Sequence, residues 1–104
     1  MIKLNLTLAA LLFSVGALAQ TPAPATTTNP AYLAANCANC HGTKGVATGS
    51  MPSLAGLKAS YISEQMRAFR DGKRPATIMH QLAKGYTDAQ IDAIAGYFAA
   101  QPAK

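Results

Sequence analysis

Cys37-Ala38-Asn39-Cys40-His41 is the stretch that decides the fold, because it brings two thiols and an imidazole together at a fixed spacing. At the end of a helix, residues three positions apart lie on one side. Both sulfurs then face the same way, and the next residue can turn beneath whatever they hold. These are the only two cysteines in the chain, and a disulfide between them would close a loop too short to stabilise much.

The spacing is the one by which two thiols add to the vinyl groups of heme while the adjacent histidine meets the iron. The alternatives are a thiol redox pair, half of a zinc site and a chance structural pair. A thioredoxin-like pair needs a βαβ setting, which the sequence lacks, and a zinc site needs two more ligands where only His80 remains. The motif therefore predicts one heme c, covalently held by Cys37 and Cys40 and ligated by His41.

Residues 1–19 are typical of a cleavable secretory signal. Lys3 gives a positive start, residues 4–18 are almost wholly apolar, and Ala17-Leu18-Ala19 is a small-x-small cleavage site. The apolar run falls short of the roughly 20 residues that cross a bilayer, which favours cleavage over a retained anchor. We therefore expect a periplasmic protein, without stable membrane insertion, whose mature body of about 85 residues is small enough to depend on a cofactor for its core.

The chain is basic, with nine Lys and Arg residues against four Asp and Glu and a formal charge of +5. Such a charge suits nucleic acid, an anionic membrane or an acidic protein, but export argues against nucleic acid. The cationic residues also lack the interleaved aromatic side chains of a base-stacking surface. They could orient a redox partner or simply form a solvated helix face. The cluster consists of Lys58, Arg67, Arg70, Lys73 and Arg74.

The folded domain is expected over residues 30–104, after a flexible Thr-, Pro- and Ala-rich leader at 20–29. Asn29 and Pro30 suit the N-cap and first position of a helix that the cysteine motif closes. Four glycines and Pro52 then predict a long loop over residues 42–56, which would wrap the cofactor.

Helical spacing recurs in the second half of the chain. An amphipathic helix is predicted over residues 60–71, one or two turns over 76–84, and a last helix from the capping box at 87–90 to Pro102. With no convincing strand and no repeat, the fold class is all-α, with about four short helices around one covalent heme. The apolar stripe of the middle helix comprises Tyr61, Ile62, Gln65, Met66 and Phe69.

The second axial ligand has four candidates. Met51 follows His41 closely and should stay on the same side of the heme, while Met66 lies on an apolar stripe where methionine usually packs. Met79 is distant from His41 in sequence and can reach the opposite face, so it is preferred over His80. His/Met ligation would suit one-electron transfer, whereas an open iron would point to gas sensing or peroxidatic chemistry.

These features together resemble a class I cytochrome c over residues 30–101: a helix, Cys-x-x-Cys-His, the Pro-x-Leu-x-Gly loop at 52–56, a methionine and a last helix bearing Tyr97-Phe98. The resemblance implies a small helical fold around the heme. It also implies that the Pro52 carbonyl accepts a hydrogen bond from the His41 ring, and that the first and last helices cross near Tyr97.

Residues 68–75, 77–80 and 83–88 are similar to the heme subunit of flavocytochrome c sulfide dehydrogenase. In that family the methionine at the Met79 position is the distal ligand, and the cytochrome accepts electrons from a sulfide-oxidising, FAD-containing flavoprotein. The resemblance thus implies an electron-transfer subunit that is not itself the catalyst. A freely diffusing cytochrome that serves a terminal oxidase or reductase is the alternative.

Overall fold

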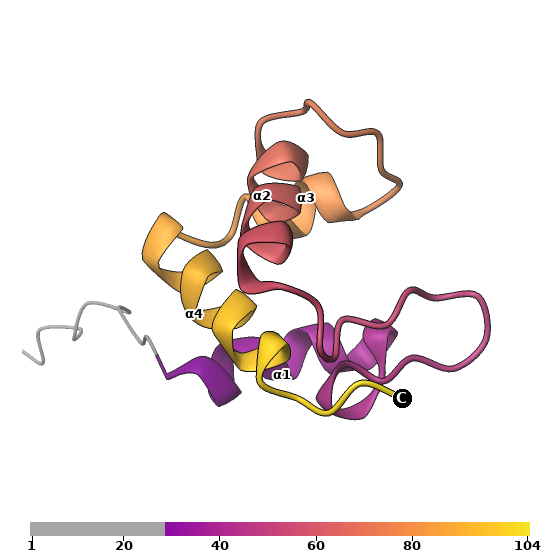
Figure 1. Ribbon diagram of the computed structural model, residues 1–104. Helices are drawn as coiled ribbons and strands as arrows, with labels where there is room; N and C mark the ends of the chain where they lie inside the picture. Colours follow the sequence, from indigo (N-terminus) through magenta and orange to yellow (C-terminus); the bar gives the residue numbers. More distant parts are fainter. Residues whose placement is uncertain (1–28) are drawn as a thin grey trace, which may run out of the picture.

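A computed structural model describes residues 29–104, which form four α-helices, one 3₁₀ turn and no strand (Figure 1). The all-α prediction is confirmed. The helices are α1 (Pro30–His41), α2 (Ala59–Arg70), α3 (Met79–Ala83) and α4 (Asp88–Ala99). The expected signal at 1–19 and all but the last residue of the leader lie outside the described residues. Within residues 29–104, no helix is long and apolar enough to cross a membrane.

The predicted caps of the first and last helices are confirmed. Asn29 Oδ1 accepts a hydrogen bond from the Tyr32 amide at 3.2 Å, and Pro30 begins α1. Before α4, Thr87 Oγ1 accepts from the Gln90 amide at 3.2 Å while Gln90 Oε1 accepts from the Thr87 amide at 2.9 Å. Both helices therefore begin where a side chain satisfies amides that have no partner within the helix.

Two local features differ from the sequence expectation. The long loop contains a 3₁₀ turn, η1 (Thr43–Gly45), in which the Gly45 amide donates to the Gly42 carbonyl at 2.9 Å. The helix expected from residue 76 begins only at Met79. Pro75 disfavours helical geometry in Arg74, the residue before it. Residues 74–78 form a non-helical segment that leads into α3.

The core is built on one face of α4. Its Ile91, Ile94 and Phe98 are the largest fully buried side chains among the described residues. α1 and α2 both pack against α4, and the later half of α4 lies over α1 in Figure 1. The remaining buried apolar side chains of this cluster are Leu33, Ala34, Ile62, Met66, Ala83 and Ala95.

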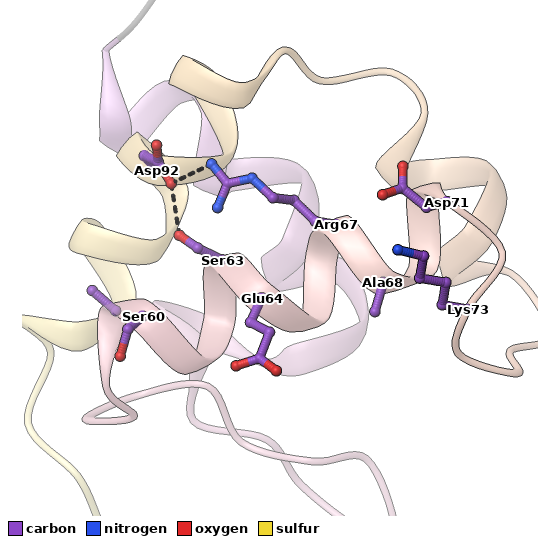
Figure 2. A pocket seen from close by; sticks show the side chains of 9 residues that line it. Ser60, Ser63, Glu64, Arg67, Ala68, Asp71, Lys73 and Asp92 are labelled. Carbon is purple, nitrogen blue, oxygen red and sulfur yellow. Dashed lines mark hydrogen bonds and ion pairs between the residues drawn. The ribbon is translucent and has the colours of Figure 1, made fainter.

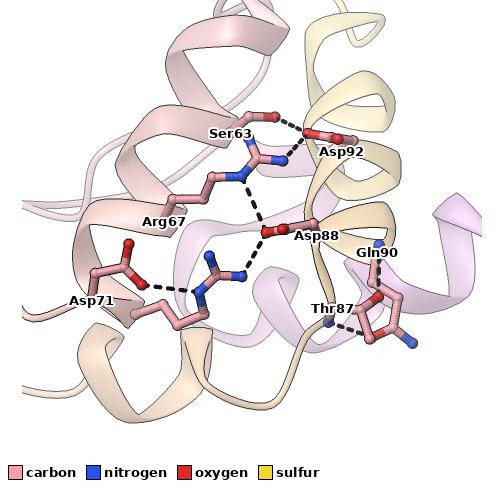
Figure 3. A network of polar contacts seen from close by, with 8 residues as sticks. Ser63, Arg67, Asp71, Thr87, Asp88, Gln90 and Asp92 are labelled. Atoms are coloured by element: carbon pink, nitrogen blue, oxygen red, sulfur yellow. Dashed lines mark hydrogen bonds and ion pairs between the residues drawn. The ribbon is translucent and has the colours of Figure 1, made fainter.

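A polar network joins α2 to α4 on the outside of this core (Figure 3). Asp92 Oδ1 accepts from Ser63 Oγ and from Arg67 Nη2, each at 2.8 Å. Asp88 Oδ1 accepts from Arg70 Nη1 at 2.6 Å and from Arg67 Nε at 3.2 Å. The hydrogen bonds from Arg70 and then Arg67 lower the pKa of Asp88, and those from Ser63 and then Arg67 lower the pKa of Asp92.

Replacing Gly45 should destabilise the fold more than replacing Gly49. Both glycines have positive φ, +79° and +68°, but a Cβ on Gly45 would lie 2.6 Å from Phe98 Cδ1 whereas one on Gly49 would meet nothing within 4 Å. We expect Gly49→Ala to cost about 1 kcal/mol and Gly45→Ala roughly 1–3 kcal/mol more, because it overpacks the core. Denaturant unfolding of both variants checks this, and equal losses would contradict the packing argument.

Asp88→Asn should weaken the fold at neutral pH and much less in acid. The folded-state pKa of Asp88 lies below its ordinary value of 3.8. Its ion pairs therefore stabilise the fold above that value, and this stability is lost as the pH falls through the folded pKa. Since these ion pairs are exposed, Asp88→Asn should lower the Tm only slightly, even at neutral pH and low salt.

Thermal unfolding against pH measures this effect, with Glu64→Gln as the control. Glu64 is an exposed carboxylate of α2 for which the described part of the chain shows no ion pair. The difference in Tm between Asp88→Asn and the unsubstituted protein should disappear as the pH approaches about 2. A difference of equal size at both ends of the range would show that the carboxylate charge is not what stabilises the fold.

Candidate functional site

The Cys-x-x-Cys-His motif at residues 37–41 opens onto an apolar cavity of about 400 Å³, within the roughly 300–1,000 Å³ of ligand pockets. The end of α1 and residues 51–57 form one wall, and α2, α3 and residues 74–78 form the others. In Figure 1 the loop after α1 and the loop between α2 and α3 project on the same side of the molecule. Segments that are far apart in the sequence therefore meet around one cavity.

The two cysteines and the histidine of the motif all line the cavity. α1 continues through His41, so the motif forms its last turns and the two cysteines lie one helical turn apart. Cys40 is exposed, whereas Cys37 is half-buried and its burial raises the pKa of its thiol. His41 is buried, with 8% of its surface exposed. Two thiols and an imidazole therefore line the same cavity.

The imidazole ring of His41 is held by the loop that follows it. His41 Nδ1 lies 2.7 Å from the carbonyl oxygen of Pro52, the contact that the family resemblance implies. A proton on Nδ1, donated to this carbonyl, leaves Nε2 free to bind a metal. The loop is itself fixed, because the Ala47 amide donates to Ser53 Oγ at 2.9 Å and the Gly56 amide donates to the Phe98 carbonyl at 2.9 Å.

The stripe of α2 that the sequence marks as apolar is the wall of this cavity. Its five residues, at positions 61, 62, 65, 66 and 69, all line it. Of the five large apolar side chains that are exposed among the described residues, all but Tyr32 line the cavity as well. An apolar occupant would remove these side chains from water and extend the core. They are Met51, Tyr61, Ile78 and Leu82.

Three of the four candidates for a second iron ligand line the cavity, and His80 does not. Met66 is 7% exposed and belongs to the buried core. Met51 adjoins Pro52, whose carbonyl contacts His41, so it lies on the histidine side of the cavity. Met79 comes from the start of α3, on a different wall.

The cationic cluster expected from the sequence does not form a single face. Arg67 and Arg70 are ion-paired with the carboxylates of Asp88, Asp92 and Asp71. Arg74 instead lines the cavity, with its guanidinium carbon 4.7 Å from the centre of the Phe69 ring. That Arg74 lines the cavity was not predicted from the sequence. The positions of Gln65 and Phe69 on the stripe of α2 that faces the cavity were the sequence feature that could have indicated it.

A second hollow lies on the outer face of α2 (Figure 2), lined by residues of α2, Asp71, Lys73 and Asp92. Figure 2 shows Ser63 and Arg67 pointing toward Asp92 across it, where both donate hydrogen bonds. Three of its polar residues, Ser63, Arg67 and Asp92, are therefore used in holding α2 to α4. It contains neither cysteine nor histidine and is distinct from the cavity beside the motif.

The residues around the cavity fit a heme. Two thiols, an imidazole with a fixed ring and a thioether face one apolar cavity, which matches the ligands and covalent anchors of a c-type heme. The zinc alternative lacks ligands: within residues 29–104 no group of three or more His, Cys, Asp or Glu side chains is placed so that it could hold a metal ion, and residues 1–28 contain none of these types. The absence of strands in the described region removes the thioredoxin-like setting.

Comparison with known proteins agrees with this geometry. The family model described as Cytochrome c matches residues 27–101. The cytochrome subunit of sulfide dehydrogenase from Chlorobaculum tepidum is 40% identical over 75 residues, which is 72% of this chain and 68% of that protein. The thiosulfate dehydrogenase electron acceptor of Thiomonas intermedia is 44% identical over 70 residues, 64% of this chain but only 32% of that protein.

A solved structure of a cytochrome agrees with these sequence comparisons. The cytochrome c4 of Acidithiobacillus ferrooxidans superposes with a TM-score of 0.59 at 41% sequence identity, covering 61% of this chain and 37% of that protein. The chain thus spans about a third of the length of this structure and of the thiosulfate dehydrogenase electron acceptor. It belongs to the cytochrome c family, as an electron carrier whose one heme c is bound covalently through Cys37 and Cys40.

Proposed function

We propose that this cytochrome is a periplasmic one-electron carrier, and that it is the heme subunit that accepts electrons from a sulfide-oxidising flavoprotein. The match to the cytochrome subunit of sulfide dehydrogenase carries this proposal, because it extends over 72% of this chain and 68% of that relative. The thiosulfate dehydrogenase electron acceptor is matched over only 32% of its length. Similarity over most of both chains supports a shared role better than similarity to one part of a larger protein.

His41 and Met79 are proposed as the two axial ligands. His41 is buried and its ring is fixed by the Pro52 carbonyl, while Met79 lines the cavity from α3. Binding from both sides would leave the iron without an open position, which suppresses oxygen and ligand chemistry. The bound heme supplies the one-electron redox change, and the thioether of methionine favours a high potential.

The chain itself contributes positioning and an apolar environment. Cys37 and Cys40 hold the heme edge, and Pro52 keeps the Nδ1 proton of His41 in place. Leu54, Leu57 and Ile94 contribute apolar side chains to the lining of the cavity. We assign the bond-making chemistry to the partner.

Export is the second part of the proposal. Heme c is attached outside the cytoplasm, and residues 1–19 have the pattern of a cleavable signal. Cleavage after Ala19 would leave the leader at 20–29 in front of α1. A protein in the periplasm would meet the dehydrogenases that oxidise sulfur compounds there.

A freely diffusing carrier is the second candidate. The 44% identity to a thiosulfate dehydrogenase electron acceptor supports a carrier that takes its electrons from a different dehydrogenase. Both candidates use the same heme site and differ only in the partner.

Met79→Ala should abolish the weak far-red sulfur-to-iron band of the oxidised protein, because the thioether that gives rise to it is gone. Met51→Ala, Met66→Ala and His80→Ala should all retain the band and serve as matched controls, since Met66 packs in the core, Met51 adjoins Pro52 on the histidine side and His80 does not line the cavity. Absorption spectra of the four heme-loaded variants measure this. Loss of the band in a control but not in Met79→Ala would assign the ligand elsewhere.

The partner is tested by reduction of the oxidised cytochrome, followed through its visible absorption. A sulfide-oxidising flavoprotein with sulfide should reduce it rapidly and should co-elute with it in gel filtration. A thiosulfate dehydrogenase with thiosulfate should reduce it slowly or not at all. The flavoprotein without sulfide is the control. Fast reduction by the thiosulfate enzyme alone, without a stable complex with the flavoprotein, would replace the first candidate by the second.

A further inference from the structure

Within residues 29–104, Arg74 supplies the only fixed positive charge on the cavity wall. Among the described residues that line the cavity, it is the only Lys or Arg, and there is no Asp or Glu. The ion pairs between described residues use Arg67 and Arg70, and none uses Arg74. Its charge is therefore not neutralised by a carboxylate of this part of the chain.

The guanidinium of Arg74 is held in place by two residues of α2. It lies over the Phe69 ring, with 4.7 Å between the guanidinium carbon and the ring centre. Arg74 Nη1 also donates a hydrogen bond to Gln65 Oε1. Gln65 and Phe69 lie four residues apart, on neighbouring positions of the same helix face. This support restricts a long, flexible side chain at the cavity wall and leaves the other guanidinium donors free for a ligand.

Heme brings negative charge into this setting through its propionate side chains. A carboxylate placed against an apolar wall is costly unless it is paired. A guanidinium is the side chain best suited to the pairing, because its planar set of donors matches a carboxylate with two parallel hydrogen bonds. The cavity wall offers one such group and no competing acid.

We propose that Arg74 binds a heme propionate and that its charge raises the reduction potential of this cytochrome, with Gln65 and Phe69 as positioning residues. Reduction adds one negative charge to the heme, and a nearby cation favours the reduced state. The inference rests on heme in the cavity beside Cys37 and Cys40. It adds a role for Arg74 that is independent of the electron-transfer partner.

The test compares heme-loaded wild type with Arg74→Gln, Arg74→Lys and Lys73→Gln. The readouts are the midpoint reduction potential and the propionate bending band in the resonance Raman spectrum. Arg74→Gln should lower the potential and shift the propionate band. Arg74→Lys should restore part of the potential, because it keeps the charge but loses the planar contacts. Lys73→Gln removes the same charge one residue away, from a side chain that lines the other hollow, and should change both readouts much less.

If Arg74→Gln does not fold, Gln65→Met is measured in its place. This variant keeps the charge and the shape of the helix face but removes the acceptor that holds Arg74, so it should shift the propionate band in the same direction by less. An unchanged band and potential in the Arg74 variants, or shifts as large in Lys73→Gln, would overturn the inference. Absence of covalent heme from the wild type would instead contradict the cytochrome assignment itself, so the two failures are distinguishable.

Discussion

The contact between the His41 ring and the Pro52 carbonyl, at 2.7 Å, joins the two parts of the chain that make the heme site. It connects the end of α1 to a loop that is otherwise anchored by Gly45 and by the Phe98 carbonyl of α4. The contact therefore keeps this loop close to the end of α1, and the loop residues held there form part of the cavity wall. The close approach of Gly45 to Phe98 leaves no room for a side chain, which explains why the turn depends on glycine.

The heme site and the hydrophobic core are continuous. Ile62, Met66 and Ile94 belong to the buried core and also line the cavity. In a domain this small, a bound cofactor contributes apolar surface that the side chains alone do not provide. The inner stripe of α2 thus serves both purposes, while its outer face is held to α4 by the ion pairs of Arg67 and Arg70.

Much of this structure follows from local sequence signals. The capping residues at Asn29 and Thr87 and the stripe of α2 are set by interactions within a few residues, and the structure confirms them. The heme motif is equally local. The start of α3 at Met79 and the 3₁₀ turn at Thr43–Gly45 were not predicted, because they depend on how the loops close over the cavity. The division of the cationic cluster between Arg67, Arg70 and Arg74 depends on which acids and aromatic rings the fold brings near, and the charge pattern of the cluster alone does not indicate it.

The central claim is that one heme is joined to the chain by both cysteines, and whole-protein mass spectrometry under denaturing conditions tests it most directly. The protein is isolated from the periplasm of cells that assemble c-type cytochromes. We predict the mass of the processed chain plus one heme, retained after unfolding. A chain without added mass, or a heme that is released on unfolding, would contradict the claim and leave Cys37 and Cys40 as an ordinary pair of thiols.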